Sequence, residues 1–182
     1  MPNYNDDDEI YRIMREHFNF TKYQVRNNVI DATNVVLKDY DITRLPVQFG
    51  KVDFYFNCDS CELTTLLGCP ETVRGCFKCF NNELTDLIGG PKSVDSFYEC
   101  FDNPLKSFDG LPDHVGGSFC CDYLLGVPML RLLKFKNGIR VKHQKGLQEI
   151  LNRYAGQTPL RPAIIKCQRE LIDNGFETIA RL

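Results

Sequence analysis

The sequence is poor in several residue types and patterns that indicate particular classes of protein. It has no tryptophan, and only three histidines and three methionines among 182 residues. It has no run of about 18 apolar residues, so we predict no transmembrane helix. The first residues carry an acidic run and no apolar stretch, which does not match a secretory signal peptide. We therefore expect a protein that stays in a reducing compartment and does not enter a membrane.

Neither sign of charge dominates the composition. Lysine and arginine together number 22, aspartate and glutamate 24, and the formal net charge is −2. A strongly basic chain would predict a general affinity for nucleic acid or for an anionic membrane, and this chain gives no such signal.

Motifs of the common catalytic sites are also missing. We find no phosphate-binding glycine loop, no nucleophile elbow and no paired acid–base motif. His17, His114 and His143 are scattered along the chain, so no cysteine has an obvious basic partner in the sequence. We expect a protein that is not an enzyme and that uses no cofactor.

What the sequence does contain is a repeat. Four of its nine cysteines follow one another at intervals of 21 residues (79 − 58 = 100 − 79 = 121 − 100 = 21). Self-similarity at a fixed interval of this length is typical of a solenoid, in which one short unit stacks on copies of itself. The columns that keep the interval are Cys58, Cys79, Cys100 and Cys121; Val52, Val73, Val94 and Val115; Phe56, Phe77, Tyr98 and Phe119; Gly68, Gly89 and Gly110; and Pro70, Pro91 and Pro112.

The repeat divides the chain into a predicted solenoid over 30–143 and two flanking segments. We expect about five coils: a degenerate first one that ends at Val52, then 53–73, 74–94 and 95–115, and a shortened last one that ends near Asn137–Gly138. Segment 1–29 is predicted to be a helical cap with a helix over 6–19. Segment 144–182 is predicted to be a second helical cap. Its helices are expected over Lys145–Tyr154 and from Thr158 or Pro159 to a stop at Asn174–Gly175.

Within one coil, alternation predicts a short strand. Tyr98 and Cys100 alternate with Phe97, Glu99 and Phe101, and the columns that repeat must face inward because stacking builds a continuous core only from matching positions. Turn asparagines are expected to bond to the backbone of the next coil, and the glycine and proline columns to form the return turn. The asparagines are Asn82 and Asn103.

Two motifs carry a resemblance to known proteins. Tyr98 to Leu105 reads apolar-x-apolar-x-x-Asn-x-Leu, which is similar to a leucine-rich repeat. A longer motif, Leu-Thr-x-Leu-x-Gly-x-Pro followed by valine and then Phe-x-Cys, begins at Leu63 and again at Leu84. It resembles the leucine-rich-repeat-like accessory proteins that tailed bacteriophages encode, over about residues 30–182. The resemblance implies an α/β solenoid of parallel strands with a helical tail. Cys61 and Leu124 depart from it, because they replace the turn asparagine.

The cysteines allow a second interpretation. Cys58 to Cys61 and Cys76 to Cys79 form a CxxC–CxxC pair with a spacing close to that of zinc sites. The 21-residue column favours another role, because Cys58 and Cys79 belong to it and Cys76 should point out of its strand. We expect reduced thiols that serve as small core residues, and no metal.

The outward side of the strands is the better candidate for a binding surface. Aromatic residues there face water, and clustered exposed aromatics usually mark an interface. The alternative is that the terminal helices fold back over them. The predicted binding residues are Tyr55, Asn57, Asp59, Lys78, Phe80, Phe97, Glu99, Phe101 and Asp122.

A second candidate surface is the basic segment 131–145. It carries seven basic or histidine side chains within fifteen residues and could contact nucleic acid phosphates, or form a solvated loop. The leading hypothesis is a non-enzymatic protein-binding module. The phage resemblance implies a host protein as partner in the host cytoplasm, such as an antiviral defence component or a host enzyme.

Overall fold

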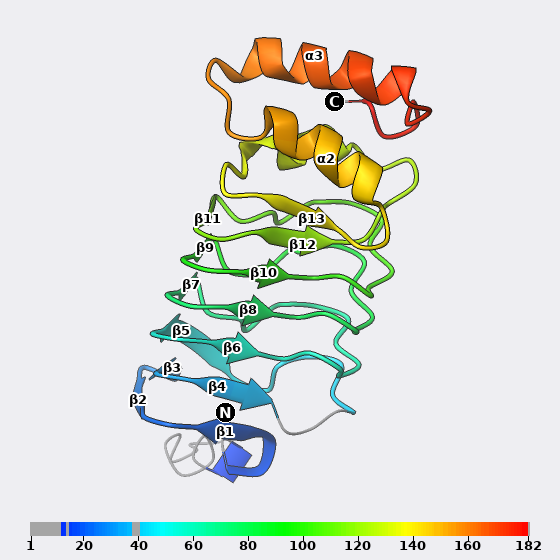
Figure 1. Cartoon of the computed structure of the whole chain (residues 1–182). Coiled ribbons are helices and arrows are strands. Elements are labelled where there is room, and N and C mark those ends of the chain that lie inside the picture. Colours follow the sequence, from blue (N-terminus) through cyan, green and yellow to red (C-terminus); the bar gives the residue numbers. More distant parts are fainter. Residues whose placement is uncertain (1–11, 14, 38–40, 182) are drawn as a thin grey trace.

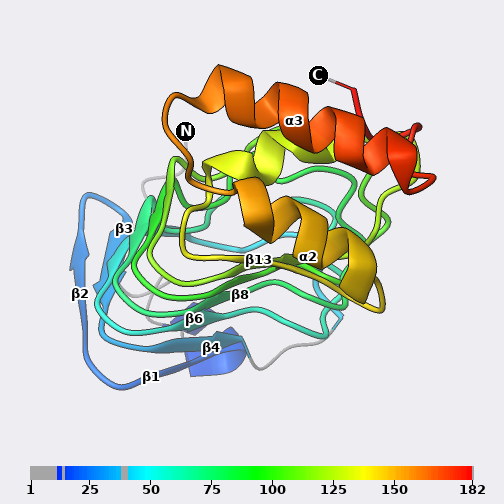
Figure 2. The ribbon, with the colours of Figure 1, turned by 45° about the horizontal axis from the view of Figure 1, so that its top comes forward.

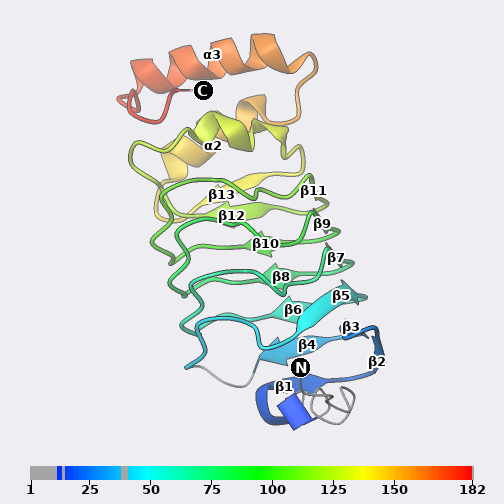
Figure 3. The ribbon, with the colours of Figure 1, turned by 180° about the vertical axis from the view of Figure 1, so that it is seen from behind.

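The structure is a computed structural model that describes residues 12–13, 15–37 and 41–181. The chain winds into a β-solenoid of about five coils, and each coil contributes short strands to two sheets (Figure 1). Strands from the N-terminal segment lie at one end of the stack and two helices lie at the other (Figures 1 and 3). The solenoid predicted from the repeat is therefore the architecture observed.

The strands form one seven-stranded and one six-stranded sheet. The first has the order β1-β4-β6-β8-β10-β12-β13 and the second β11-β9-β7-β5-β3-β2. Neighbouring strands are parallel except in the pairs β1 with β4 and β2 with β3. The bounds are β1 Phe18–Phe20, β2 Tyr23–Arg26, β3 Val29–Ala32, β4 Val35–Leu37, β5 Gln48–Val52, β6 Phe56–Asn57, β7 Thr72–Val73, β8 Phe77–Lys78, β9 Ser93–Val94, β10 Tyr98–Glu99, β11 His114–Val115, β12 Phe119–Cys121 and β13 Ile139–Val141.

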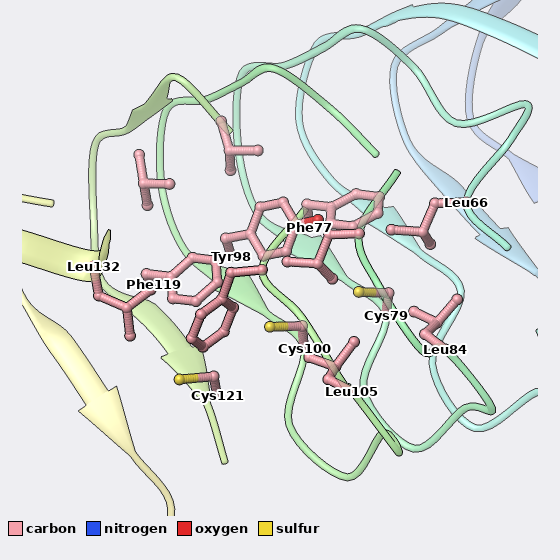
Figure 4. Close-up of a cluster of buried hydrophobic side chains, with 14 of the residues drawn as sticks. Leu66, Phe77, Cys79, Leu84, Tyr98, Cys100, Leu105, Phe119, Cys121 and Leu132 are labelled. Carbon is pink, nitrogen blue, oxygen red and sulfur yellow. The ribbon is translucent and has the colours of Figure 1, made fainter. Parts of the chain in front are cut away.

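The inward columns stack into a continuous core. The rings of Phe56, Phe77, Tyr98, Phe119 and Phe135 follow one another with centroid distances of 5.8, 4.9, 5.3 and 4.8 Å. The cysteine column runs beside this aromatic column (Figure 4). Each aromatic pair adds roughly 0.5–1.5 kcal/mol beyond the burial of its area, so matching rings in successive coils stabilise the stack.

Asparagine side chains tie the coils together at the turns after β8 and β10. The Asn82 Oδ1 atom accepts a hydrogen bond from the Leu63 N–H (3.0 Å), and its Nδ2 group donates to the carbonyls of Cys58 (2.8 Å) and Cys79 (3.1 Å). Asn103 repeats the arrangement one coil later. The bonding expected at these asparagines is present, but it reaches the preceding coil. The reason is that the Asn82 backbone N–H already donates to Asp102 of the following coil (3.2 Å).

The glycine column is required at the return turn. Gly68, Gly89 and Gly110 have φ values of 98°, 88° and 85°, in the left-handed region that other residues rarely adopt. A Cβ atom on Gly110 would also lie 2.2 Å from the Leu87 carbonyl oxygen of the preceding coil. Glycine therefore allows the coils to approach closely here.

The N-terminal segment differs from its prediction. Of the helix expected over 6–19, residues 1–11 and 14 lie outside the described residues; 12–13 and 15–17 are helical, and β1 starts at Phe18. The Phe18 ring is buried and lies 5.2 Å from that of Phe49 in an edge-on arrangement. Packing against the first coil thus favours an added antiparallel strand over continuation of the helix.

The C-terminal part contains the predicted helices and one further strand. Helix α2 spans Lys145–Tyr154 and α3 spans Leu160–Asp173, while the short 3₁₀ helix η1, Met129–Lys134, precedes β13. The solenoid was expected to end near Asn137–Gly138, but β13 continues it to Val141. The pairing of Phe119 with Ile139 gives this last coil 20 residues instead of 21 (139 − 119 = 20).

Candidate binding face

We define the outward face as the outward-pointing side chains of the seven-stranded sheet from β6 to β13. Parallel register places one residue from each strand in a central row, and alternation along the strands places further rows on either side. The central row is Asn57, Lys78, Glu99, Cys120 and Arg140.

Aromatic residues flank the central row, as predicted, but they are not freely exposed. The Phe80 and Phe101 rings stack with centroids 4.7 Å apart and an interplanar angle of 12°. Both rings, and that of Phe97, are half-buried. The sequence correctly placed these three aromatics on the outward side, but it did not show that neighbouring side chains cover part of each ring.

Much of that cover comes from the edge strand β13. The Arg140 guanidinium lies over the Phe97 ring at 5.5 Å, and the Lys142 ammonium lies over the Phe101 ring at 5.3 Å. Both side chains reach across β12 to rings that flank β10. Two surfaces that the sequence suggested separately, the aromatic rows and part of the basic segment 131–145, therefore meet on one face.

The remaining basic segment does not form a solvated loop. Leu132 and Leu133 of η1 are buried, and so are Ile139 and Val141 of β13. Arg131 pairs with Asp109 (3.1 Å), well away from the sheet rows. Only the outward residues of β13 add positive charge to the outward face.

Ion pairs balance most charges on this face. The Lys78 ammonium lies 3.5 Å from the Glu99 carboxylate, and the Lys142 ammonium donates to the Asp102 carboxylate at 2.6 Å. Asp122 accepts the backbone N–H of Asp102, and burial raises the pKa of its carboxyl group above the usual value.

A hollow of about 260 Å³ opens between β10, β12 and β13. Glu99, Phe101, Cys120, Arg140 and Lys142 are among the residues that line it, together with Gln148 of α2. Cys120 lies in an outward row yet is only 5% exposed. Burial, with a smaller contribution from the Glu99 carboxylate, raises the pKa of its thiol to about 11, so the sulfur is protonated and weakly nucleophilic at neutral pH.

The other predicted residues lie toward the N-terminal coils. Tyr55 is 41% exposed just before β6, and the turn after β6 brings together Asn57 and Asp59, whose backbone N–H donates to the Asn57 Oδ1 atom (3.2 Å). Phe54, 62% exposed beside Tyr55, was not predicted. Its column holds Gly75, Ser96 and Gly117, so an aromatic residue at this position was a visible departure from the repeat.

Helices α2 and α3 do not cover the outward face. Helix α2 packs on β13 and η1, and α3 packs on α2 and η1, so that both lie across the C-terminal end of the solenoid (Figures 1 and 2). The sheet surface from β6 to β12 is free of these two helices in both views. The alternative in which the C-terminal helices hide the aromatic rows is therefore wrong.

The CxxC pairs do not gather their sulfur atoms. Cys58 donates its S–H group to the Lys78 carbonyl oxygen (3.3 Å), Cys61 donates to Asp59 (3.4 Å), and Cys76 contacts the Ser96 hydroxyl (3.5 Å). Cys79 is buried, with the pKa of its thiol raised by desolvation. Among the described residues, no group of three or more His, Cys, Asp and Glu side chains is arranged to hold a metal ion.

Arg140 is the main residue of this face that sequence reasoning missed. It continues the Lys78–Glu99–Cys120 row, but 20 residues after Cys120 rather than 21 (140 − 120 = 20). The shortened coil hid it from a search at the constant interval, and a search that allowed one deletion after Pro128 would have found it.

Comparisons with known proteins add no relative. No protein-family model, curated protein or solved structure matches this chain. In the part of the chain that the structure describes, no helix is long and apolar enough to span a membrane.

Proposed function

We propose that this chain is a non-enzymatic protein-binding module that recognises its partner with the outward face around Phe80, Phe97 and Phe101. The observation that carries the proposal is the cluster of three half-buried aromatic rings on a sheet surface that α2 and α3 leave open. Aromatic and arginine side chains dominate the binding energy of many protein interfaces, and this face offers both.

The departures from the repeat point the same way. The column of Phe80 and Phe101 holds Asp59 and Asp122 in other coils, so stacking of the solenoid does not demand an aromatic ring there. Repeat scaffolds use such variable outward positions for recognition. A partner that packs against the rings explains why two successive coils carry them.

The identity of the partner rests on the sequence resemblance. We propose a leucine-rich-repeat-like phage accessory protein that acts in the host cytoplasm and modulates a host protein, for example a component of antiviral defence. The two terminal segments would then act as caps. In support of the C-terminal cap, Asn152 of α2 bonds to both the N–H and the carbonyl of Ile139, at 2.7 Å each, and so occupies the open edge of β13.

A second candidate function is single-stranded nucleic acid binding. The observation in its favour is that Arg140 and Lys142 lie over aromatic rings, a combination that stacks bases and neutralises phosphates. The carboxylates of Glu99, Asp102 and Asp122 on the same face oppose it, because they would repel a phosphate backbone.

The decisive experiment is capture of a partner from host lysate by the double variant Phe80→Ala with Phe101→Ala. We expect loss of the captured protein with the fold retained, because interface aromatics typically contribute about 2 kcal/mol or more, roughly a thirtyfold change in affinity. The matched control is Leu67→Ala with Ile88→Ala, which removes two exposed apolar side chains from outside this face and should leave capture intact.

Three other outcomes would redirect the proposal. Retained capture at unchanged affinity would move the site to another surface. Unfolding of the variant would mean that the rings belong to the core. Recovery of nucleic acid instead of protein, sensitive to salt, would favour the second candidate.

A further inference from the structure

Arg140 differs from the other cations of the outward face in its lack of a carboxylate partner. Lys78 is paired with Glu99 and Lys142 with Asp102. Among the residues that the structure describes, Arg140 makes no ion pair or side-chain hydrogen bond, and its guanidinium contacts the Phe97 ring. Its N–H donors are therefore free to bind a ligand while the ring holds the planar group in position.

The charges around Arg140 leave a single positive group to be matched. Burial keeps the Cys120 thiol neutral beside it, and the neighbouring carboxylates of Glu99 and Asp102 are already paired with lysines. One guanidinium with free N–H groups suits one carboxylate, which it can bind through two parallel hydrogen bonds. A phosphate chain would bring several negative charges close to Glu99 and Asp122, and is disfavoured for that reason.

The hollow next to Arg140 suits an apolar side chain. Its volume of about 260 Å³ lies below the roughly 300–1,000 Å³ of clefts that hold small molecules. Phe101, Cys120 and Val141 supply apolar wall, and Arg140 and Lys142 stand at its sides. A space of this size fits one side chain of a larger partner better than it fits a free cofactor.

We propose that the hollow beside Arg140 binds a linear peptide segment of the partner in which an aspartate or glutamate lies next to an apolar residue. The carboxylate pairs with the Arg140 guanidinium, and the apolar side chain enters the hollow against Phe101 and the Cys120 thiol. The inference rests on the proposed protein-binding function, and it specifies the chemistry of the segment that the outward face recognises.

The test uses a library of random twelve-residue peptides, displayed and selected on the full-length protein. We expect enrichment of sequences with an acidic residue beside an apolar one. Affinities of the enriched synthetic peptides, measured by calorimetry, should fall by about tenfold or more with Arg140→Gln, because a charge-assisted hydrogen-bonded pair is lost. Arg140→Lys should retain only part of the affinity, since lysine keeps the charge but lacks the planar fork.

The matched control is Arg161→Gln, which removes an exposed arginine on α3 and should leave peptide affinity unchanged. Selection of no peptide, or of acidic peptides whose affinity survives Arg140→Gln, overturns the inference. Enriched peptides without carboxylates that lose affinity with Phe80→Ala and Phe101→Ala would also overturn it, but would leave the protein-binding function standing. Binding of single-stranded oligothymidylate that depends on Arg140, with no acidic peptide bound, would overturn both.

Discussion

The inward and outward sides of the seven-stranded sheet are built from the same strands but follow different rules. Inward positions repeat the same residue types from coil to coil: Phe56, Phe77, Tyr98 and Phe119 are all fully buried. Outward positions change at each coil, from Asn57 to Lys78, Glu99, Cys120 and Arg140. The uniform side is held by stacking with identical neighbours, whereas nothing in the stack constrains the variable side.

This difference separates stability from recognition within single residues' reach of one another. Phe77 and Phe80 stand three positions apart, but the Phe77 ring is enclosed between two core rings while the Phe80 ring is half-buried against Phe101. In a repeat protein, a break in the column pattern on the outward side is therefore the sign of a binding residue. A break on the inward side would mark a packing defect.

The largest effect is expected from removal of residues 144–182. Leu147 and Leu151 of α2 are buried against the last coil, and Asn152 and Gln148 bond to the backbone of β13. Without them the apolar end of the solenoid meets water and the edge strand is open, so we expect aggregation and loss of a cooperative thermal transition. Circular dichroism melting with light scattering measures both effects.

The control for the truncation is Ile172→Ser, an exposed position on α3 that should melt like the wild type. A truncated chain that stays monomeric with an unchanged melting curve would show that the C-terminal helices do not cap the solenoid.

Alkaline pH should weaken the inward side through its thiols. Burial raises the pKa values of Cys69, Cys79, Cys100 and Cys121 above the ordinary value. Above about pH 8.5 the unfolded chain releases these protons while the folded chain keeps them, so stability is complete below that pH and falls as pH rises. Each thiol contributes a slope of about 1.4 kcal/mol per pH unit.

The slope is measured from urea unfolding between pH 7 and pH 10. Cys79→Ala should make it shallower by one thiol's share, about 1.4 kcal/mol per pH unit. Phe77→Ala serves as control, since it disturbs the same core without removing a titrating group and should keep the full slope. Equal slopes in wild type and Cys79→Ala would contradict the role given to burial.

The two sides are compared most directly by a pair of alanine substitutions in neighbouring coils. Phe77→Ala should lower the free energy of unfolding by about 3–5 kcal/mol, because it leaves a cavity between stacked rings. Phe97→Ala should lower it by about 1 kcal/mol or less, since a half-buried ring loses mainly its contact with Arg140. Urea denaturation at pH 7 distinguishes them, and similar losses for both would place Phe97 in the core.

The smallest effect is expected from Lys142→Gln on the outward side. The Lys142–Asp102 pair is partly exposed, with side-chain exposures of 34% and 42%. Such pairs contribute about 0–1 kcal/mol, and the contribution should shrink further in high salt. A loss of several kcal/mol, insensitive to salt, would indicate that the basic residues of β13 are structural and not part of a binding surface.

Much of the fold was predictable because the repeat makes stacking visible in the sequence. The inward columns, the return-turn glycines and the bounds of α2 followed from periodicity and from helix signals at Gln144 and Gly156. Strand β1 did not, because Phe18 and Phe20 read equally well as part of an amphipathic helix. Their strand conformation depends on the ring of Phe49, which is 29 residues or more away along the chain (49 − 20 = 29).

The candidate face was only half predictable. Alternation placed Phe80, Phe97 and Phe101 outward, because side-chain direction within a short strand is a local property. That Arg140 and Lys142 reach over β12 to these rings depends on the register between β12 and β13, and that register follows from where η1 packs.

The sequence by itself determined the solenoid, the identity of its core columns and the outward position of the aromatic residues, because each of these follows from a repeat interval and a strand period. Only the tertiary structure decided that the C-terminal helices leave the face open, that Cys120 is buried, and that the basic segment contributes two cations to the aromatic rows. These are matters of how unlike elements pack on one another, and packing at the end of a repeat is not repeated anywhere in the sequence.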